Sequence, residues 1–208
     1  MLRRVFSLIG ALIFSITAFG QVDSVLLSRI KLGDTDKETN LALAQLKEQK
    51  IDTIVIYYTQ CIGSYLPIKL DSCSSSFTKY LIWKVKNQSY IRKFDGCYQY
   101  EENRISSLFL NSLYSRIEEF KGSKVLYPEY TEIKNGKKNK LRIMLDHSCH
   151  YMFEVHTRMG ILKQDVDDFA LSTKYIDDNK RQLNENYQNN QRSYLKKLVD
   201  AAEQLTKP

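Results

Sequence analysis

The sequence predicts an α+β fold, with an antiparallel sheet of about five strands, N-terminal helices, one inserted helix and a long C-terminal helix. Runs of β-branched and aromatic residues, such as TIVIYYTQC, are typical of strands. Other segments carry apolar residues at every third or fourth position, which is typical of amphipathic helices. With three prolines and no linker rich in serine and glycine, residues 21–208 are expected to form a single domain.

Residues 1–20 have the pattern of a secretory signal peptide. Arg3 and Arg4 precede an apolar run from Val5 to Ile16, and small residues follow up to Gly20. We expect cleavage after Gly20. An uncleaved anchor is the alternative, but a transmembrane helix needs about 20 mostly apolar residues. No second hydrophobic span follows, and without Arg3 and Arg4 the chain, whose formal net charge is +7, stays basic. The expected location is therefore secreted or periplasmic.

The N-terminal helices are expected on either side of Gly33. Val22, Val25, Leu26 and Ile30 give the first segment a short helical pattern that ends at Gly33. Thr35 and Glu38 then form a capping box ahead of NLALAQLKEQK, whose apolar side is Leu41, Leu46 and either Ala42 or Ala44. The following run, TIVIYYTQC, has almost no polar break, which predicts a central strand buried on both faces.

The segment FTKYLIWKVKNQSYIRKFDGCYQY predicts a β-hairpin that turns at Asn87 and Gln88. A two-residue loop there sets Val85 opposite Tyr90, with Trp83 opposite Arg92 and Leu81 opposite Phe94. One face is then the core face, made of Leu81, Trp83, Val85, Tyr90 and Phe94. The other face is half apolar, and we expect another element to cover it; it carries Tyr80, Ile82, Lys84, Ile91 and Lys93.

Two later segments have helical periodicity. From Asn103 to Gly122, apolar residues recur every three or four positions and predict the inserted helix. From about Asp177 a second apolar stripe predicts the C-terminal helix, with an opposite face of asparagine and glutamine that we expect to be solvated. The stripe consists of Leu183, Tyr187, Tyr194, Leu198, Ala202 and Leu205.

All three histidines lie in the stretch LDHSCHYMFEVH, which predicts one arm of a second hairpin. In each arm the apolar residues are odd-numbered, so within a strand they share one face. They are Leu141, Ile143 and Leu145 in the first arm and Tyr151, Phe153 and Val155 in the second. A three-residue loop of His147, Ser148 and Cys149 would bring both sets to one core face and set Asp146 opposite His150. The outer face would then hold His150 and His156.

This geometry argues against a metal or catalytic site in the histidine stretch. His150 and His156 would lie about 20 Å apart, too far to bind one ion. Two alternatives stay open: a surface ion shared by His147 and His150, and a nucleophilic Cys149 beside them. Both are weak, since the two imidazoles have no fixed carboxylate and an exported cysteine tends to be oxidised. We therefore predict no catalytic, cofactor-binding or metal-binding residue.

The four cysteines, Cys61, Cys73, Cys97 and Cys149, predict two disulfides, because an even number occurs in a chain expected to be exported. Cys61 and Cys73 flank a short irregular segment, so their pairing costs little loop entropy. Cys97 would then pair with Cys149. A zinc site is the alternative, but the spacings contain no C-x-x-C knuckle.

The remaining feature with functional potential is the loop KNGKKNK. Lys134, Lys137, Lys138 and Lys140 gather around Asn135-Gly136, and such a cluster can dock onto a phosphate-rich surface. The alternative, a solvated turn, is the commoner fate of charges beside Asn-Gly. No phosphate-binding loop, G-x-S-x-G elbow or H-E-x-x-H motif occurs in the sequence.

Two function classes follow. The first is a non-enzymatic binding or interaction domain of the periplasm or cell exterior, with an anionic envelope surface or another exported protein as its partner. The second is an exported hydrolase whose residues converge only in the fold. The sequence has no specific nucleic-acid motif, and its richness in lysine, asparagine and tyrosine suggests a bacterial exported protein on composition alone.

Overall fold

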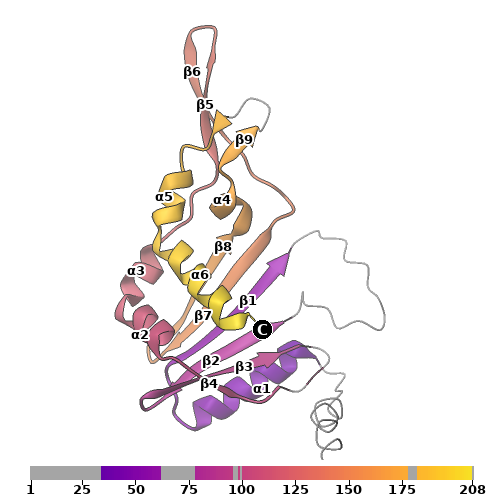
Figure 1. Cartoon of the computed structure of the whole chain (residues 1–208), viewed down its shortest axis with the longest axis vertical. Coiled ribbons are helices and arrows are strands. Elements are labelled where there is room, and N and C mark those ends of the chain that lie inside the picture. The colour runs from indigo at the N-terminus through magenta and orange to yellow at the C-terminus, as the bar shows by residue number, and fades with distance from the viewer. Residues whose placement is uncertain (1–33, 62–77, 96–97, 99, 178–181, 208) are drawn as a thin grey trace, which may run out of the picture.

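A computed structural model describes residues 34–61, 78–95, 98, 100–177 and 182–207 (Figure 1). The predicted signal peptide and the helical pattern that ends at Gly33 lie outside the described residues. So do Cys73 and Cys97. The expected α+β class is confirmed, because helices pack on both faces of an antiparallel sheet.

The sheet has six strands in the order β4-β3-β2-β1-β7-β8, all paired antiparallel. Its strands are β1 (Ile54–Cys61), β2 (Lys79–Val85), β3 (Gln88–Phe94), β4 (Asn103–Ile105), β7 (Cys149–Thr157) and β8 (Gly160–Asp167). The first four residues of β1 are buried, and β1 lies between β2 and β7. The prediction of a central strand buried on both faces is therefore confirmed.

One face of the sheet is covered by α2 (Leu108–Ser115), α3 (Ile117–Gly122) and α6 (Tyr194–Thr206), as Figure 1 shows. Phe120 and Leu195 from these helices pack with Val55, Phe153 and Val155 from the strands, and all five are almost fully buried. The other face is covered over β1, β2 and β3 by α1 (Thr35–Glu48), which contributes Leu43 and Leu46 to a second core.

Helix α1 differs from its prediction in its cap and its apolar side. Asp34, not Thr35, is the N-cap, and its carboxylate accepts hydrogen bonds from the backbone N–H groups of Asp36 and Lys37. Leu46 is buried as expected, but Leu41 is 57% exposed and Leu43 takes its place in the core. The cap moved by one residue because an aspartate is at least as good an N-cap as a threonine.

The first hairpin turns one residue earlier than predicted. Val85 pairs with Gln88 and Trp83 with Tyr90, so the loop is Lys86-Asn87, with Lys86 in the left-handed region at φ 54°. The pairing differs from the prediction by two positions, which preserves the assignment of residues to faces. The half-apolar face predicted to be covered is indeed covered, since Ile82 and Ile91 lie in the core beneath α2 and α6.

The inserted helix is shorter and broken. Residues 103–105 form the edge strand β4, and the helical part divides into α2 and α3 at Arg116, whose φ of −121° is not helical. Phe109, Leu113 and Phe120 are buried as the periodicity predicts. The spacing of the apolar residues predicts which of them are buried, but it does not reveal that a single non-helical residue interrupts the helix.

The predicted second hairpin is wrong. Leu141 lies instead in β6 (Lys137–Arg142), which pairs with β5 (Glu129–Lys134), while β7 pairs with β1 and β8. Asn135 and Gly136 have φ values of 53° and 73°, as a type I′ turn requires, and close the β5–β6 hairpin locally. Leu141 and Leu145 are consequently 38% and 49% exposed, not core residues. Phe153 and Val155 are buried as expected.

The predicted C-terminal helix is also divided. After α4 (Asp168–Ser172), the small strands β9 (Tyr175–Asp177) and β10 (Gln182–Leu183) pair with each other, and α5 (Tyr187–Arg192) precedes α6. Ser193 separates α5 from α6 and caps α6 through its hydroxyl group, which accepts from the N–H of Lys196. Tyr194, Leu198 and Ala202 are buried as predicted, whereas Leu183 is 51% exposed.

Candidate functional site

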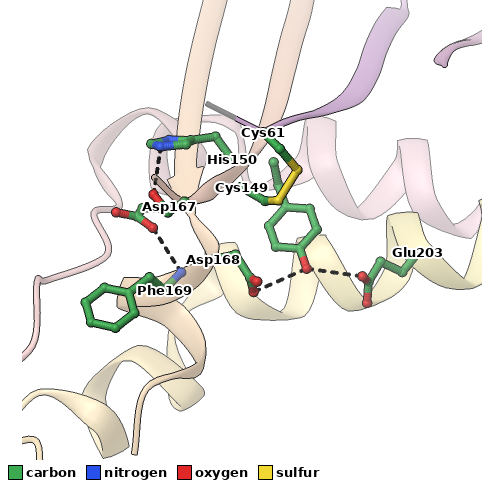
Figure 2. Close-up of a disulfide and its surroundings, with 9 residues drawn as sticks. Cys61, Cys149, His150, Asp167, Asp168, Phe169 and Glu203 are labelled. Atoms are coloured by element: carbon green, nitrogen blue, oxygen red, sulfur yellow. Dashed lines mark hydrogen bonds between the residues drawn. A yellow bond between two sulfur atoms is a disulfide. The ribbon is translucent and has the colours of Figure 1, made fainter. Parts of the chain in front are cut away.

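The disulfide joins Cys61 to Cys149, the last residue pair between β1 and β7 (Figure 2). The predicted pairs Cys61–Cys73 and Cys97–Cys149 are therefore wrong. Local loop closure favoured Cys61–Cys73, but the pairing of β1 with β7 sets Cys61 directly opposite Cys149. No cysteine within the described ranges is free.

The two strand histidines lie in different environments. His150 lies near the disulfide (Figure 2), with its Nδ1 2.6 Å from the Asp165 carboxylate and its Nε2 3.1 Å from the Ser148 hydroxyl group. The predicted pairing of His150 with Asp146 is wrong, because the neighbouring strand is β8. The described residues contain no group of three or more histidine, cysteine or acidic side chains that could hold a metal ion.

His156 is buried, not on a solvent-exposed outer face as predicted. Only 5% of the residue is exposed, and neither ring nitrogen has a hydrogen-bond partner among the described residues. Its strand position pairs with Ile54 of β1 and Ile161 of β8. Burial and the nearby charges of Lys47 and Lys163 lower the pKa of His156, against an opposing effect of Glu154. The ring is therefore neutral at pH 7.

The structure divides the four predicted lysines between the two faces of the β5–β6 hairpin. Lys134 and Lys137 pair across the turn and share one face, whereas Lys138 and Lys140 lie on the other. Lys140 is not available as a free charge, because its ammonium group lies 2.6 Å from the Glu129 carboxylate. Lys134, Lys137 and Lys138 are exposed and have no ion-pair partner in the described part of the chain.

The base of this hairpin is held by an ion pair. Arg142 donates to the same Glu129 carboxylate at 2.7 Å, and together Lys140 and Arg142 lower the pKa of Glu129 to about 2. Glu129 is therefore ionised throughout the physiological range and neutralises part of the basic charge. The lysines whose charge is not compensated therefore lie at the tip of the hairpin, and they are Lys134, Lys137 and Lys138.

Buried asparagines fix the chain that leads into the hairpin, a role that sequence reasoning missed when it assigned these amides to a solvated face. Asn190 is fully buried; its side chain donates to the carbonyls of Leu126 and Ala170 and accepts from the N–H of Leu126. Asn184, 1% exposed, accepts from the N–H of Glu129 and donates to the Thr173 carbonyl. Only burial distinguishes these amides from solvated ones, and no local pattern indicates it.

The hairpin projects beyond the main sheet, with β9 beside its base (Figure 1). Backbone and side-chain contacts continue along the lower part of β5: the Glu185 N–H donates to the Glu129 carbonyl, and the Thr131 hydroxyl donates to the Glu185 carboxylate. We call residues 129–142 the basic arm. Its base is tied to the domain, while its lysine-bearing tip extends away from it.

Tyr151 lies between two carboxylates, Asp168 of α4 and Glu203 of α6 (Figure 2), with its hydroxyl oxygen 3.3 Å from each. Burial and these negative charges raise the pKa of Tyr151. The residues line a hollow of about 270 Å³ together with Lys196 and Asp200, which form an ion pair with each other. A tyrosine kept protonated can donate a hydrogen bond but cannot act as a base near neutral pH.

A second, larger hollow of about 510 Å³ lies where the end of α1 meets the turn between β7 and β8. His156 and Ile54 form part of its wall, and Lys47, Lys50 and Arg158 also line it. Asp52, which also lines it, accepts a hydrogen bond from Arg158, and this bond lowers the pKa of Asp52. The hollow is thus cationic, a property that residues so far apart in sequence do not indicate.

In the described part of the chain, no helix is long and apolar enough to cross a membrane. Neither a family model, nor a curated protein, nor a solved structure matches this chain. The interpretation of function therefore depends on the geometry of the basic arm and of the hollows.

Proposed function

We propose that the protein is an exported binding domain that docks onto anionic lipid headgroups of the cell envelope through its basic arm. The observation that carries this proposal is the gathering of Lys134, Lys137 and Lys138 at the tip of a hairpin that projects from the domain. Export is supported by the signal-like residues 1–20 and by the Cys61–Cys149 disulfide, because disulfides persist mainly in oxidising compartments.

The shape of the arm suits a surface better than a small ligand. Its tip lysines lie on both faces of a two-stranded hairpin, so they form no pocket but can reach several headgroups at once. Ile133, 69% exposed and opposite Lys138, adds an apolar side chain beside them. Each lysine near an anionic membrane strengthens binding about fivefold at physiological ionic strength. This attraction decays over about one Debye length from the membrane surface, so only lysines close to the surface contribute.

A hydrolase is the second function class, and the described carboxyl groups give it less support. A general acid at neutral pH needs a raised pKa, whereas ion pairs lower the pKa of Asp52 and of Glu129. Asp168 and Glu203 face each other only through the Tyr151 hydroxyl group. We therefore take the binding function as the conclusion.

The proposal is tested by sedimentation with vesicles of phosphatidylglycerol or of phosphatidylcholine. The triple variant Lys134→Gln/Lys137→Gln/Lys138→Gln should lose binding to the anionic vesicles by about 100-fold, from the fivefold contribution of each lysine. The matched control, Lys121→Gln/Lys124→Gln/Lys197→Gln, removes the same charge from exposed lysines elsewhere and should keep most of it. Equal losses in both variants, or equal binding of the wild type to both lipids, would contradict the proposal.

A further inference from the structure

The hollow between α1 and the β7–β8 turn brings together three cationic side chains from separate elements. Lys47 lies in the last turn of α1, Lys50 follows the helix, and Arg158 comes from the turn that joins β7 to β8. Among the described residues that line the hollow, the single carboxylate is that of Asp52, and Arg158 already binds it. Lys47 and Lys50 have no ion-pair partner within the described ranges, so positive charge is in excess there.

His156 adds a feature that the cations alone would not give. The residue is 5% exposed and lies in the wall of the hollow, and its two ring nitrogens are buried without a hydrogen-bond partner among the described residues. Buried polar groups in folded proteins are nearly always hydrogen-bonded, so an unpartnered imidazole indicates a missing partner. A neutral imidazole carries one N–H donor, which an anionic oxygen can satisfy.

The strand around His156 is fixed, so the imidazole does not depend on a mobile backbone. The Tyr114 hydroxyl group donates to the His156 carbonyl at 2.7 Å and accepts from the Ile54 N–H at 2.9 Å. These bonds hold β7 against β1 at the level of the hollow. The volume of about 510 Å³ lies in the range of small-molecule pockets.

We propose that this hollow binds a small ligand through an oxyanion group, a phosphate or a carboxylate, whose oxygen accepts a hydrogen bond from His156 while Lys47 and Lys50 compensate its charge. Arg158 stays bound to Asp52. The site shares no residue with the basic arm, so it is independent of the function proposed above.

The test uses the side-chain NMR signals of the histidines, of which the chain has three. Inorganic phosphate, or acetate in a second titration, is added at constant ionic strength maintained with chloride. We expect a saturable shift of the His156 ring signal with at least one of the two, while the signal of the exposed His147 does not saturate. The more effective anion identifies the ligand class.

Two double variants make the test specific. Lys47→Gln/Lys50→Gln should weaken the affinity about tenfold or more, since it removes two charged donors. Lys121→Gln/Lys124→Gln removes the same charge from exposed residues of α3 and the segment after it and should leave the affinity unchanged. An unchanged thermal midpoint shows that each variant is folded. A His156 signal that moves with neither anion, or equal weakening in both variants, would overturn the proposal.

Discussion

Removal of the Cys61–Cys149 disulfide should destabilise the domain by several kcal/mol. The bond joins residues separated by 88 positions, so it restricts a large part of the unfolded chain. The chain-entropy relation gives about 4.6 kcal/mol at 25 °C for a loop of this length. A local Cys61–Cys73 bond would give only about 3 kcal/mol by the same relation, so the two pairings differ in stability as well as in connectivity.

The assay is urea unfolding of wild type and of Cys61→Ala/Cys149→Ala. The chain has a single tryptophan, Trp83, which is 5% exposed and stacked on Tyr90, so its fluorescence reports loss of the core. We expect a lower urea midpoint and, since the uncrosslinked chain exposes more surface when unfolded, a steeper transition.

Peptide mapping without reductant supplies the independent test of the connectivity. It should recover Cys61 linked to Cys149, and the even cysteine count then leaves Cys73 and Cys97 as partners of each other. A Cys61–Cys73 peptide, or a loss of less than about 1 kcal/mol in the double alanine variant, would refute the reasoning from strand pairing and loop length.

Three further predictions concern β7 and its neighbours. Phe153→Ala should lower the free energy of unfolding in urea by about 3–5 kcal/mol, since the side chain is fully buried. Leu145→Ala should lower it by less than about 0.5 kcal/mol because Leu145 is exposed. The reverse order would favour the hairpin predicted from the sequence. Tyr114→Phe should lower stability by about 1–3 kcal/mol, because it leaves the Ile54 N–H and the His156 carbonyl without their partner, and an unchanged thermal midpoint would show that water replaces the hydroxyl group. Burial lowers the pKa of His156 below its unfolded value of about 6.5, so the unfolded chain takes up the proton first as the pH falls. The free energy of unfolding should therefore decrease as the pH drops below about 6.5 and level off below the pKa of the folded state. His156→Gln should remove this part of the pH dependence.

The sequence by itself determined the α+β class, the central strand and most of the residues that face the core. Periodicity carries this information, because a period of two or of 3.6 identifies which side chains share a face. The first hairpin shows how robust this is. Its turn was predicted one residue late, yet the shift of two positions in pairing left Leu81, Trp83, Tyr90 and Phe94 on the correct face.

The tertiary structure alone decided which strands pair at long range. The odd-numbered residues of β7 were correctly predicted to face the core, but any apolar strand with suitable parity could have been their partner. The run from Leu141 to Leu145 is nearest in sequence, yet the turn at Asn135-Gly136 pairs Leu141 and Arg142 with β5 instead. β7 pairs instead with β1 and β8, one along each of its edges.

The disulfide and the candidate sites follow from that pairing. Cys149 reaches Cys61 only because β7 lies beside β1, and the same ladder buries His156 next to the end of α1. In sequence, Asn190 is indistinguishable from a solvated amide; only the fold brings it to the backbone of Leu126, to which it hydrogen-bonds. The local pattern of apolar residues determines which side of each helix or strand faces the core. Contacts between distant elements depend instead on the free energy of the whole folded chain, which no single segment determines.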